Sequence, residues 1–168
     1  PDMPDPPASA TQPPLGSGEV VRLTGSTHDA DAMITKNAAT VEALNRRLIA
    51  KIEEHRAALE RVTPDVQSGA ETLLISYGTS AGAMRLALRQ ARAVGRRVSA
   101  AIVESLWPIP ARALAEAAEG VRRIVVGELN PGLYARELPC LFPDREIVSL
   151  TRIDGRLITP EMYLETCL

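Results

Sequence analysis

The chain is poor in aromatic residues and in net charge, and each scarcity excludes a class of partner. Aromatic residues make up 3% of the 168 residues, which leaves little ring surface for stacking bases or sugars. The 19 Lys and Arg against 21 Asp and Glu give a formal net charge of −2, without the basic surplus that nucleic acids or anionic membranes select. No apolar run approaches the roughly 20 residues of a membrane span. We therefore expect no nucleic-acid partner, no membrane span and a cytoplasmic location.

Cysteine is equally scarce, because Cys140 and Cys167 are the only two. Two cysteines make no disulfide framework, and His28 and His55 lie too far from them in sequence for a zinc-site spacing. We expect two free thiols and no metal site.

Proline is abundant at the start of the chain. Residues 1–18, "PDMPDPPASATQPPLGSG", resemble an interior linker, because such a segment lacks backbone donors and apolar periodicity. The remaining length suits one domain with a real core, so we expect a single α/β domain over 19–168, cut from a longer protein.

Hydrophobic patterning predicts an alternation of strands and helices after one long helix. The β-branched residues of 19–25 indicate a strand, and an apolar stripe through Leu44 and Leu48 predicts a helix over about 40–62, ended by Pro64. Strands are then expected over 72–78, 98–107, 121–129 and 145–153, and helices over 79–95, 108–120, just after Asn130 and from 159. Because the later strands are apolar throughout, they are expected to be buried on both faces of a mainly parallel sheet between helix layers.

Candidate sites fall where parallel strands end, at 77–82, 104–110 and 127–132. The first segment lacks the glycine and lysine pattern of a phosphate loop, so a tight strand-to-helix turn explains it. Glu104 and Glu128 could converge as paired carboxylates for acid–base chemistry, but hydrogen bonds from neighbouring helix N-termini are the favoured interpretation. No nucleophile–histidine–acid arrangement is readable, and no residue is assigned as catalytic, cofactor-binding or metal-binding.

Several motifs in order resemble one known family. They are "RLTGSTHDADAMIT" (22–35), "LLISYGTSAGAMRLALRQARAVGRRV", "ESLWPIP", "VVGELNPGLYARELPCL" and "IDGRLITPEMYLETCL". Together they resemble the C-terminal part of the alpha subunit of 2-oxoacid:ferredoxin oxidoreductases of the 2-oxoglutarate type, over residues 19–168. The motif residues that we carry over as family or interface positions are Thr24, Gly25, His28, Asp29, Trp107, Pro108, Glu128, Asn130 and Gly132.

The resemblance implies a three-layer α/β/α domain similar to the transketolase C-terminal domain, with five strands of which one runs against the rest. It also implies a whole enzyme that oxidatively decarboxylates a 2-oxoacid, releases an acyl-CoA and passes electrons to ferredoxin. Thiamine diphosphate would be held between the pyrimidine-side domain of the alpha subunit and the beta subunit, and the iron–sulfur clusters would lie on the beta subunit or on separate subunits. CoA is implied for the full complex, and the fragment alone would be inactive. The family implies Gly near Ala32 and Gln at Leu133, so we expect an altered turn at the first position and lost partner contacts at the second.

Two alternatives of other classes stay open. A free-standing small-molecule or nucleotide-binding module would use the three strand ends as one pocket. An assembly-forming domain would bind no small molecule and could form a homo-oligomer through its long helix and sheet edge. We expect "GELNPG" to end a strand, with Glu128 and Asn130 organising a turn that faces a neighbouring domain or subunit; direct ligand contact and chemistry are the alternatives for this segment.

Overall fold

The computed structural model describes residues 14–19 and 24–167. The contacts divide the chain into two compact units, Pro1–Arg56 and Ala57–Leu168. The strand expected over 19–25 falls mainly on residues 20–23, outside the described part of the chain.

The first unit is built around helix α1, Ala38–Glu53. Its N-cap is Asn37, whose Oδ1 accepts a hydrogen bond from the backbone N–H of Thr40 at 3.1 Å. A short helix α2 follows at Arg56–Leu59, and strand β1 begins at Val62. The single helix expected over 40–62 is therefore wrong, because the chain leaves the helix at residues 54–55 and again after Leu59. Residues 62–65 pair with another strand instead of continuing a helix.

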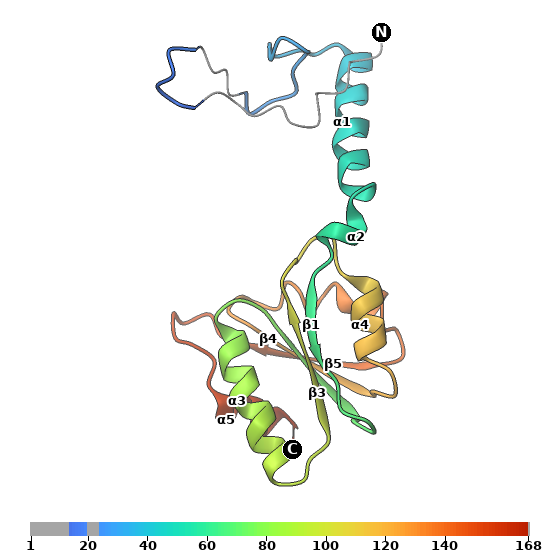
Figure 1. Cartoon of the computed structure of the whole chain (residues 1–168), viewed down its shortest axis with the longest axis vertical. Helices are drawn as coiled ribbons and strands as arrows, with labels where there is room; N and C mark the ends of the chain where they lie inside the picture. Colours follow the sequence, from blue (N-terminus) through green and yellow to red (C-terminus); the bar gives the residue numbers. More distant parts are fainter. Residues whose placement is uncertain (1–13, 20–23, 168) are drawn as a thin grey trace. The chain divides into compact units, whose positions relative to one another are not determined.

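The second unit contains a five-stranded sheet of order β1-β3-β2-β4-β5 (Figure 1). The strands are β1 (Val62–Asp65), β2 (Thr72–Ser76), β3 (Val98–Val103), β4 (Arg123–Glu128) and β5 (Glu146–Thr151). All neighbouring pairs are parallel except β1 with β3, which is antiparallel. The expectation of a mainly parallel sheet with one reversed strand is confirmed, and the strand that is reversed is β1.

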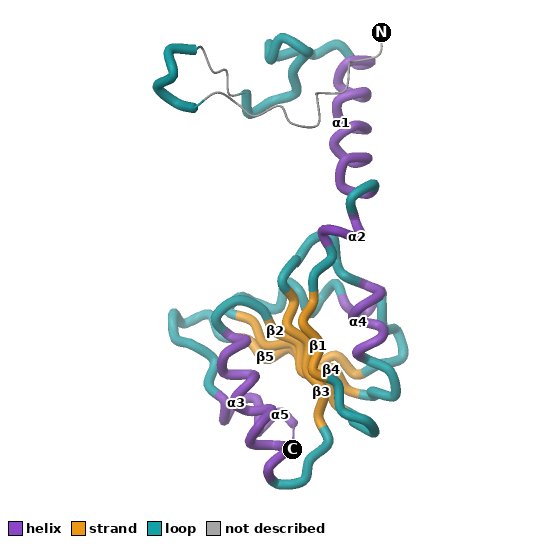
Figure 2. The backbone as a smooth tube through the Cα atoms, in the orientation of Figure 1, coloured by secondary structure: helices purple, strands orange, loops and turns teal. Residues whose placement is uncertain are grey.

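Helices cover both faces of this sheet, which makes three layers (Figure 2). Helix α3 (Ser80–Ala93) packs against α5 (Pro160–Cys167) on one face, and α4 (Ala111–Ala117) lies on the other. Alternate residues of each central strand enter the two cores: Leu73 and Ile75 pack with Leu114 on the α4 side, while Leu74 packs with Met84 on the α3 side. The runs of β2, β3 and β4 are thus buried on both faces, as their composition predicts. The edge strand β5 has no fully buried residue and differs from that expectation, because only one neighbouring strand flanks it.

Two loops at the carboxyl ends of the strands differ from expectation. Strand β3 ends at Val103 rather than at 107. The segment that follows, "ESLWPIP", contains two prolines, which have no backbone N–H to donate to a sheet. The short helix expected after Asn130 is a series of turns closed by one 3₁₀ turn, η1 (Leu138–Cys140). Gly132, at a φ of 82°, and the Pro in the η1 turn explain why no regular helix forms there.

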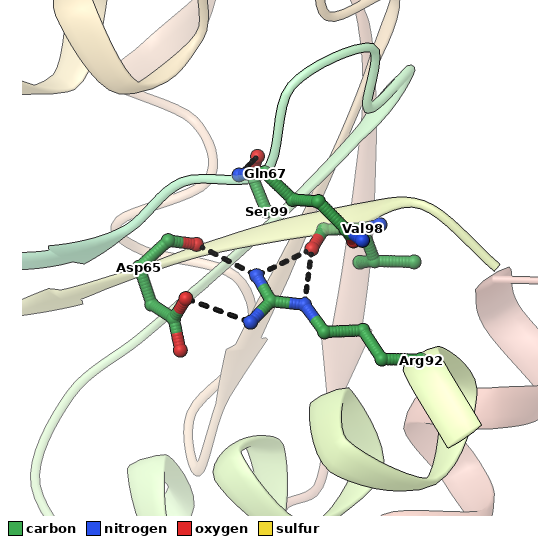
Figure 3. Close-up of polar contacts among 5 residues, drawn as sticks. All are labelled: Asp65, Gln67, Arg92, Val98 and Ser99. Atoms are coloured by element: carbon green, nitrogen blue, oxygen red, sulfur yellow. Dashed lines mark hydrogen bonds and ion pairs between the residues drawn. The ribbon is translucent and has the colours of Figure 1, made fainter. Parts of the chain in front are cut away.

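The edge strand β1 is held by a polar network (Figure 3). The guanidinium of Arg92, near the end of α3, donates to Oδ1 of Asp65 at 2.8 Å and to the backbone carbonyl of Asp65 at 3.2 Å. The same group donates to the carbonyl of Val98 at 2.9 and 3.1 Å. Behind it, Oε1 of Gln67 accepts a hydrogen bond from the backbone N–H of Val98, and the backbone N–H of Gln67 donates to Ser99 Oγ. One arginine thus ties a helix end to two strands.

Candidate functional site

Glu128, the last residue of β4, is completely buried at the carboxyl end of the sheet. One carboxylate oxygen accepts hydrogen bonds from Tyr77 Oη at 2.9 Å and from the backbone N–H of Tyr134 at 3.0 Å. The other oxygen accepts the N–H of Ala135 at 3.0 Å. The expected donors were the N-termini of neighbouring helices, and that expectation is wrong: the two backbone donors belong to a turn, and the third donor is a phenol.

Glu104 does not join Glu128. It follows β3, and β2 lies between β3 and β4, so two strand spacings, about 10 Å, separate the two strand ends. Glu104 instead accepts the hydroxyl of Thr63 at 2.6 Å and pairs with Arg61 at 3.3 Å near the surface. The two carboxylates therefore form no acid–base pair.

Asn130 organises the loop that follows β4. Its Oδ1 accepts the N–H groups of Gly132 at 3.0 Å and Leu133 at 2.8 Å, and its Nδ2 donates to Tyr77 Oη at 2.6 Å. A Cβ at Gly132 would approach Ser149 Oγ to 2.8 Å, and the φ of 82° disfavours other residues as well. The motif thus builds an Asx-type turn anchored on the neighbouring strand end.

Two tyrosines complete the cluster, and sequence reasoning missed both. The rings of Tyr77 and Tyr134 meet edge to face at 5.8 Å between centroids. Burial, followed by the hydrogen bond to Glu128, raises the pKa of Tyr77 to about 12. Burial above all, then the charges of Tyr77 and Glu128, also raises the pKa of Tyr134. Both phenols are neutral near pH 7, and Tyr77 is the donor in its bond to the carboxylate.

A second, smaller chain of hydrogen bonds fixes α5 on the sheet. Tyr163 Oη donates to Ser76 Oγ at 3.1 Å, and Ser76 Oγ donates to the carbonyl of Gly127 at 2.9 Å. A Cβ at Gly127 would lie 1.8 Å from Tyr163 Oη, so only glycine leaves room for this phenol. Gly127 was visible in the sequence, but Tyr163 lies far along the chain and gave no signal of its partner.

Exposed apolar side chains gather in the loops at the same edge of the sheet. Trp107, joined to the buried Pro108 by a cis peptide bond, is 69% exposed, and Leu133 is 57% exposed. The carboxyl ends of β2, β3, β4 and β5 share one edge because these strands are parallel. We call the exposed residues that follow them the apolar edge: Leu106, Trp107, Leu129, Leu133, Ile153 and Leu157.

The motif residues of the first unit make a local turn. Thr24 Oγ1 donates to the carbonyl of Ala32 at 2.8 Å, and Asp29 Oδ1 accepts the N–H groups of Asp31 and Met33, both at 3.0 Å. The backbone at Ala32 has a φ of 59°, as expected for a position that favours glycine.

His28 and Gly25 take part in the same region without forming a catalytic arrangement. His28 Nδ1 lies 2.9 Å from the carbonyl of Ser26, and its backbone forms a bridge with Ile34. A side chain at Gly25 would meet open space, so the structure gives no steric reason for glycine there. Thr24, His28 and Asp29 thus belong to a hydrogen-bonded loop in one unit, and Glu128 and Asn130 to the other unit.

The described side chains do not match the donor sets of the groups that the resemblance implies. Cys140 is an exposed free thiol and Cys167 a partly buried one, whereas an iron–sulfur cluster takes four thiolates. Among the described residues no three His, Cys, Asp or Glu side chains are grouped as metal ligands. Within the same residues, no helix has the length and apolarity to cross a bilayer. Both oxygens of Glu128 are engaged, so this carboxylate does not fit the role of cofactor activator.

A 2-oxoglutarate synthase subunit KorA of Methanothermobacter marburgensis is 31% identical over 154 residues, which cover 90% of this chain and 41% of that protein. The chain therefore spans less than half the length of this curated relative.

Solved structures show the same fold. The 2-oxoglutarate:ferredoxin oxidoreductase of Magnetococcus marinus, with 2-oxoglutarate, coenzyme A and succinyl-CoA bound, matches at a TM-score of 0.70 and 22% identity, over 91% of this chain and 27% of that one. An inactive β4 tetramer of a split-gene transketolase matches at 0.54 and 17%, over 62% and 39% of the two chains. The expected transketolase-like fold is confirmed. Since the family model of the pyruvate:ferredoxin oxidoreductase core domain II matches residues 70–163, more than half of the chain, the protein belongs to that family.

Proposed function

We propose that this chain is the C-terminal assembly domain of the alpha subunit of a cytoplasmic 2-oxoacid:ferredoxin oxidoreductase, of the 2-oxoglutarate type. The whole enzyme oxidatively decarboxylates the 2-oxoacid to an acyl-CoA and passes the electrons to ferredoxin. Membership of the core domain II family and the likeness to a 2-oxoglutarate synthase subunit support this assignment.

The observation that carries the assembly role is the apolar edge. Its members come from the loops after three strands of one sheet, and they include the one tryptophan of the chain. Exposed apolar patches of this kind mark protein interfaces, and tryptophan is enriched among the residues that dominate binding energy. More than half of the curated relative lies outside the match, so the proposed occupant of this edge is a thiamine-binding domain of the same alpha subunit.

The polar cluster beneath this edge has a supporting role in the proposal. The side-chain oxygens of Glu128 and Asn130 accept hydrogen bonds from backbone N–H groups and thereby hold Leu133 and its neighbours in a defined loop. In this scheme thiamine diphosphate, CoA and the iron–sulfur clusters are bound by the other domains and by the beta subunit. The residues of this chain orient and bury surfaces of those domains, and none is assigned a chemical step.

The test begins with the parent protein from its native source. An antibody against this domain would recover the protein for measurement of its mass, its companions and CoA-dependent viologen reduction with several 2-oxoacids. We expect a chain of more than twice this length, a thiamine-binding partner and fastest reduction with 2-oxoglutarate. A companionless chain of 18.1 kDa without reductase activity would contradict the proposal.

A further inference from the structure

The amino ends of the parallel strands form the edge opposite to the apolar edge, and arginines gather there. Thr72 of β2 is in register with Val98 of β3 and with Arg123 of β4, which in turn is in register with Glu146 of β5. The first residues of four strands therefore lie in one row. The arginines that open or immediately precede these strands are Arg96, Arg97, Arg122, Arg123 and Arg145.

A cavity of about 360 Å³ lies in this row, where β2 and β3 begin. Its side chains include those of Glu71, Thr72, Arg96 and Arg97, and Cys167 lies at its border. The guanidinium of Arg97 extends over the turn at Gly69, where a Cβ would come within 2.5 Å of Arg97 Nη1. The absence of a side chain at this turn thus leaves space for one of the two arginines.

The charges of this cavity do not cancel. Glu71, the one carboxylate in its wall, is paired with Arg122 at 2.5 Å, and Arg123 pairs with Glu146 at 3.5 Å. Within the described residues, the guanidinium groups of Arg96 and Arg97 have no hydrogen bond and no ion pair. The cavity therefore has two solvent-exposed cationic side chains in its lining, whose N–H donors are not engaged by other described residues.

We propose that this cavity binds the phosphate group of a small molecule, with Arg96 and Arg97 as its cationic donors and the hydroxyl of Thr72 as a third donor. Guanidinium forks match phosphate oxygens in pairs, and a terminal phosphate presents three acceptor oxygens where a carboxylate presents two. The overall charge of −2 and the few aromatic residues argue for a small ligand over a nucleic acid. This site lies at the edge opposite to the apolar edge and is independent of the proposed assembly role.

Titration of the full chain with inorganic phosphate, diphosphate and adenosine diphosphate tests the site. Binding is followed by calorimetry and by NMR shifts of the Thr72 and arginine side-chain resonances, at a constant ionic strength of about 0.15 M set with chloride. We expect saturable shifts confined to the cavity. Tighter binding of adenosine diphosphate would indicate an organic phosphate, and equal affinity would indicate that the phosphate group alone is recognised; both support the site.

A pair of variants separates the site from general charge effects. Arg96→Ala with Arg97→Ala should weaken phosphate binding at least about tenfold, the loss expected when charge-assisted hydrogen bonds are removed. Arg112→Ala, on the exposed start of α4, removes a positive charge away from the cavity and should leave binding unchanged. Thr72→Val tests the third donor without altering charge. Non-saturable shifts, or equal losses in the cavity and Arg112 variants with circular dichroism unchanged, would overturn the proposal.

Discussion

Glu128 is a buried carboxylate whose partners are neutral hydrogen-bond donors. Two backbone N–H groups and one phenol replace the water that the charge loses on folding. Such a group is expensive to disturb, because each donor would be left unsatisfied in a dry environment. At the scale of single residues, this carboxylate is what connects the end of β4 to the following loop.

Glu128→Gln should lower the free energy of unfolding by about 1–3 kcal/mol, because the amide NH₂ would face a backbone donor. Urea unfolding measures this change. Glu104→Gln makes the same substitution at a partly exposed ion pair, where about 0–1 kcal/mol is expected. Equal costs at both positions would show that the hydrogen bonds of Glu128 contribute no more than a surface pair.

The raised pKa values of the tyrosines make the free energy of unfolding depend on pH in the alkaline range. The pKa of Tyr77 is raised from 10.0 to about 12, so its phenol keeps its proton to higher pH in the folded chain than in the unfolded one. The stability that this provides is complete below pH 10 and is lost as pH rises through about 12. Burial raises the pKa of Tyr163 to about 12 as well, and these two with Tyr134 are the only tyrosines.

Tyrosinate absorbance should therefore rise later in the native chain than in urea, and the urea midpoint should fall between pH 10 and 12. Tyr77→Phe keeps the ring against Tyr134 but removes one titrating group, so it should reduce the pH dependence over that interval. Ionisation near pH 10 in a chain that stays folded would contradict the prediction.

At the scale of elements, β1 depends on contacts outside itself. It has four residues, includes Pro64 and lies at the sheet edge, so its own sequence favours a strand weakly. Arg92 compensates by donating to Asp65 of β1 and to Val98 of β3 (Figure 3). This network explains why a stretch without strand-like patterning completes the sheet.

Arg92→Ala should lower the free energy of unfolding by about 1–3 kcal/mol and speed amide hydrogen exchange in Val62–Asp65, because charged hydrogen bonds to two strands are lost. Arg89→Ala removes the same charge from an exposed position of the same helix and should stay within about 0.5 kcal/mol of the parent. If the exchange of β1 were unchanged in Arg92→Ala, the network would not be what holds this strand.

The packing of α5 on the sheet requires a glycine at position 127. Gly127→Ala would force Tyr163 away from Ser76, so we expect a loss of about 1–3 kcal/mol in unfolding free energy together with faster exchange in α5. Gly82→Ala is the matched control, because it lies in α3 with open space around its Cβ position. That variant should be neutral or stabilising by up to about 1 kcal/mol. Destabilisation of both variants alike would point to backbone effects rather than to the phenol.

At the scale of the whole molecule, the sheet presents two different edges. The carboxyl ends carry the apolar edge beside the buried Glu128, and the amino ends carry arginines around a cavity. Parallel strands cause this separation, because every strand contributes its first residues to one edge and its last residues to the other. The proposed protein interface and the proposed phosphate site therefore lie at opposite edges and do not overlap.

The single tryptophan reports on the apolar edge directly. Trp107 is 69% exposed, so its emission in this chain should be red-shifted and readily quenched by acrylamide, and binding of the companion domains should reverse both. Trp107→Ser should weaken that association by at least about tenfold in ultracentrifugation. Val94→Ser changes an equally exposed apolar residue at the end of α3 and should not affect it. Unchanged emission and affinity would remove this edge from the interface.

Local chemistry in the amino-acid sequence was enough to predict much of this protein. Continuous apolar runs followed by helical stripes predicted the order of β2 through α5 and a mainly parallel sheet, because strands buried on both faces cannot alternate polar and apolar residues. The motif at 127–132 predicted a turn, because Asn before Pro and a Gly at positive φ suit one. The family resemblance, rather than local chemistry, implied a backbone that favours glycine near Ala32, where φ is 59°.

Only the tertiary structure decided which residues meet. Tyr77 lies 51 positions from Glu128, and Tyr163 lies 87 positions from Ser76, so neither pair has a signal in local sequence. One reversed strand was expected from the family resemblance, but its position at Val62–Asp65 escaped prediction, because β1 is stabilised by pairing with β3 and by Arg92 rather than by its own residues. The amino-acid sequence by itself determined the elements, since burial and backbone preference act within a few residues. Their assembly decided the site, since hydrogen bonds between strand ends exist only after the sheet has formed.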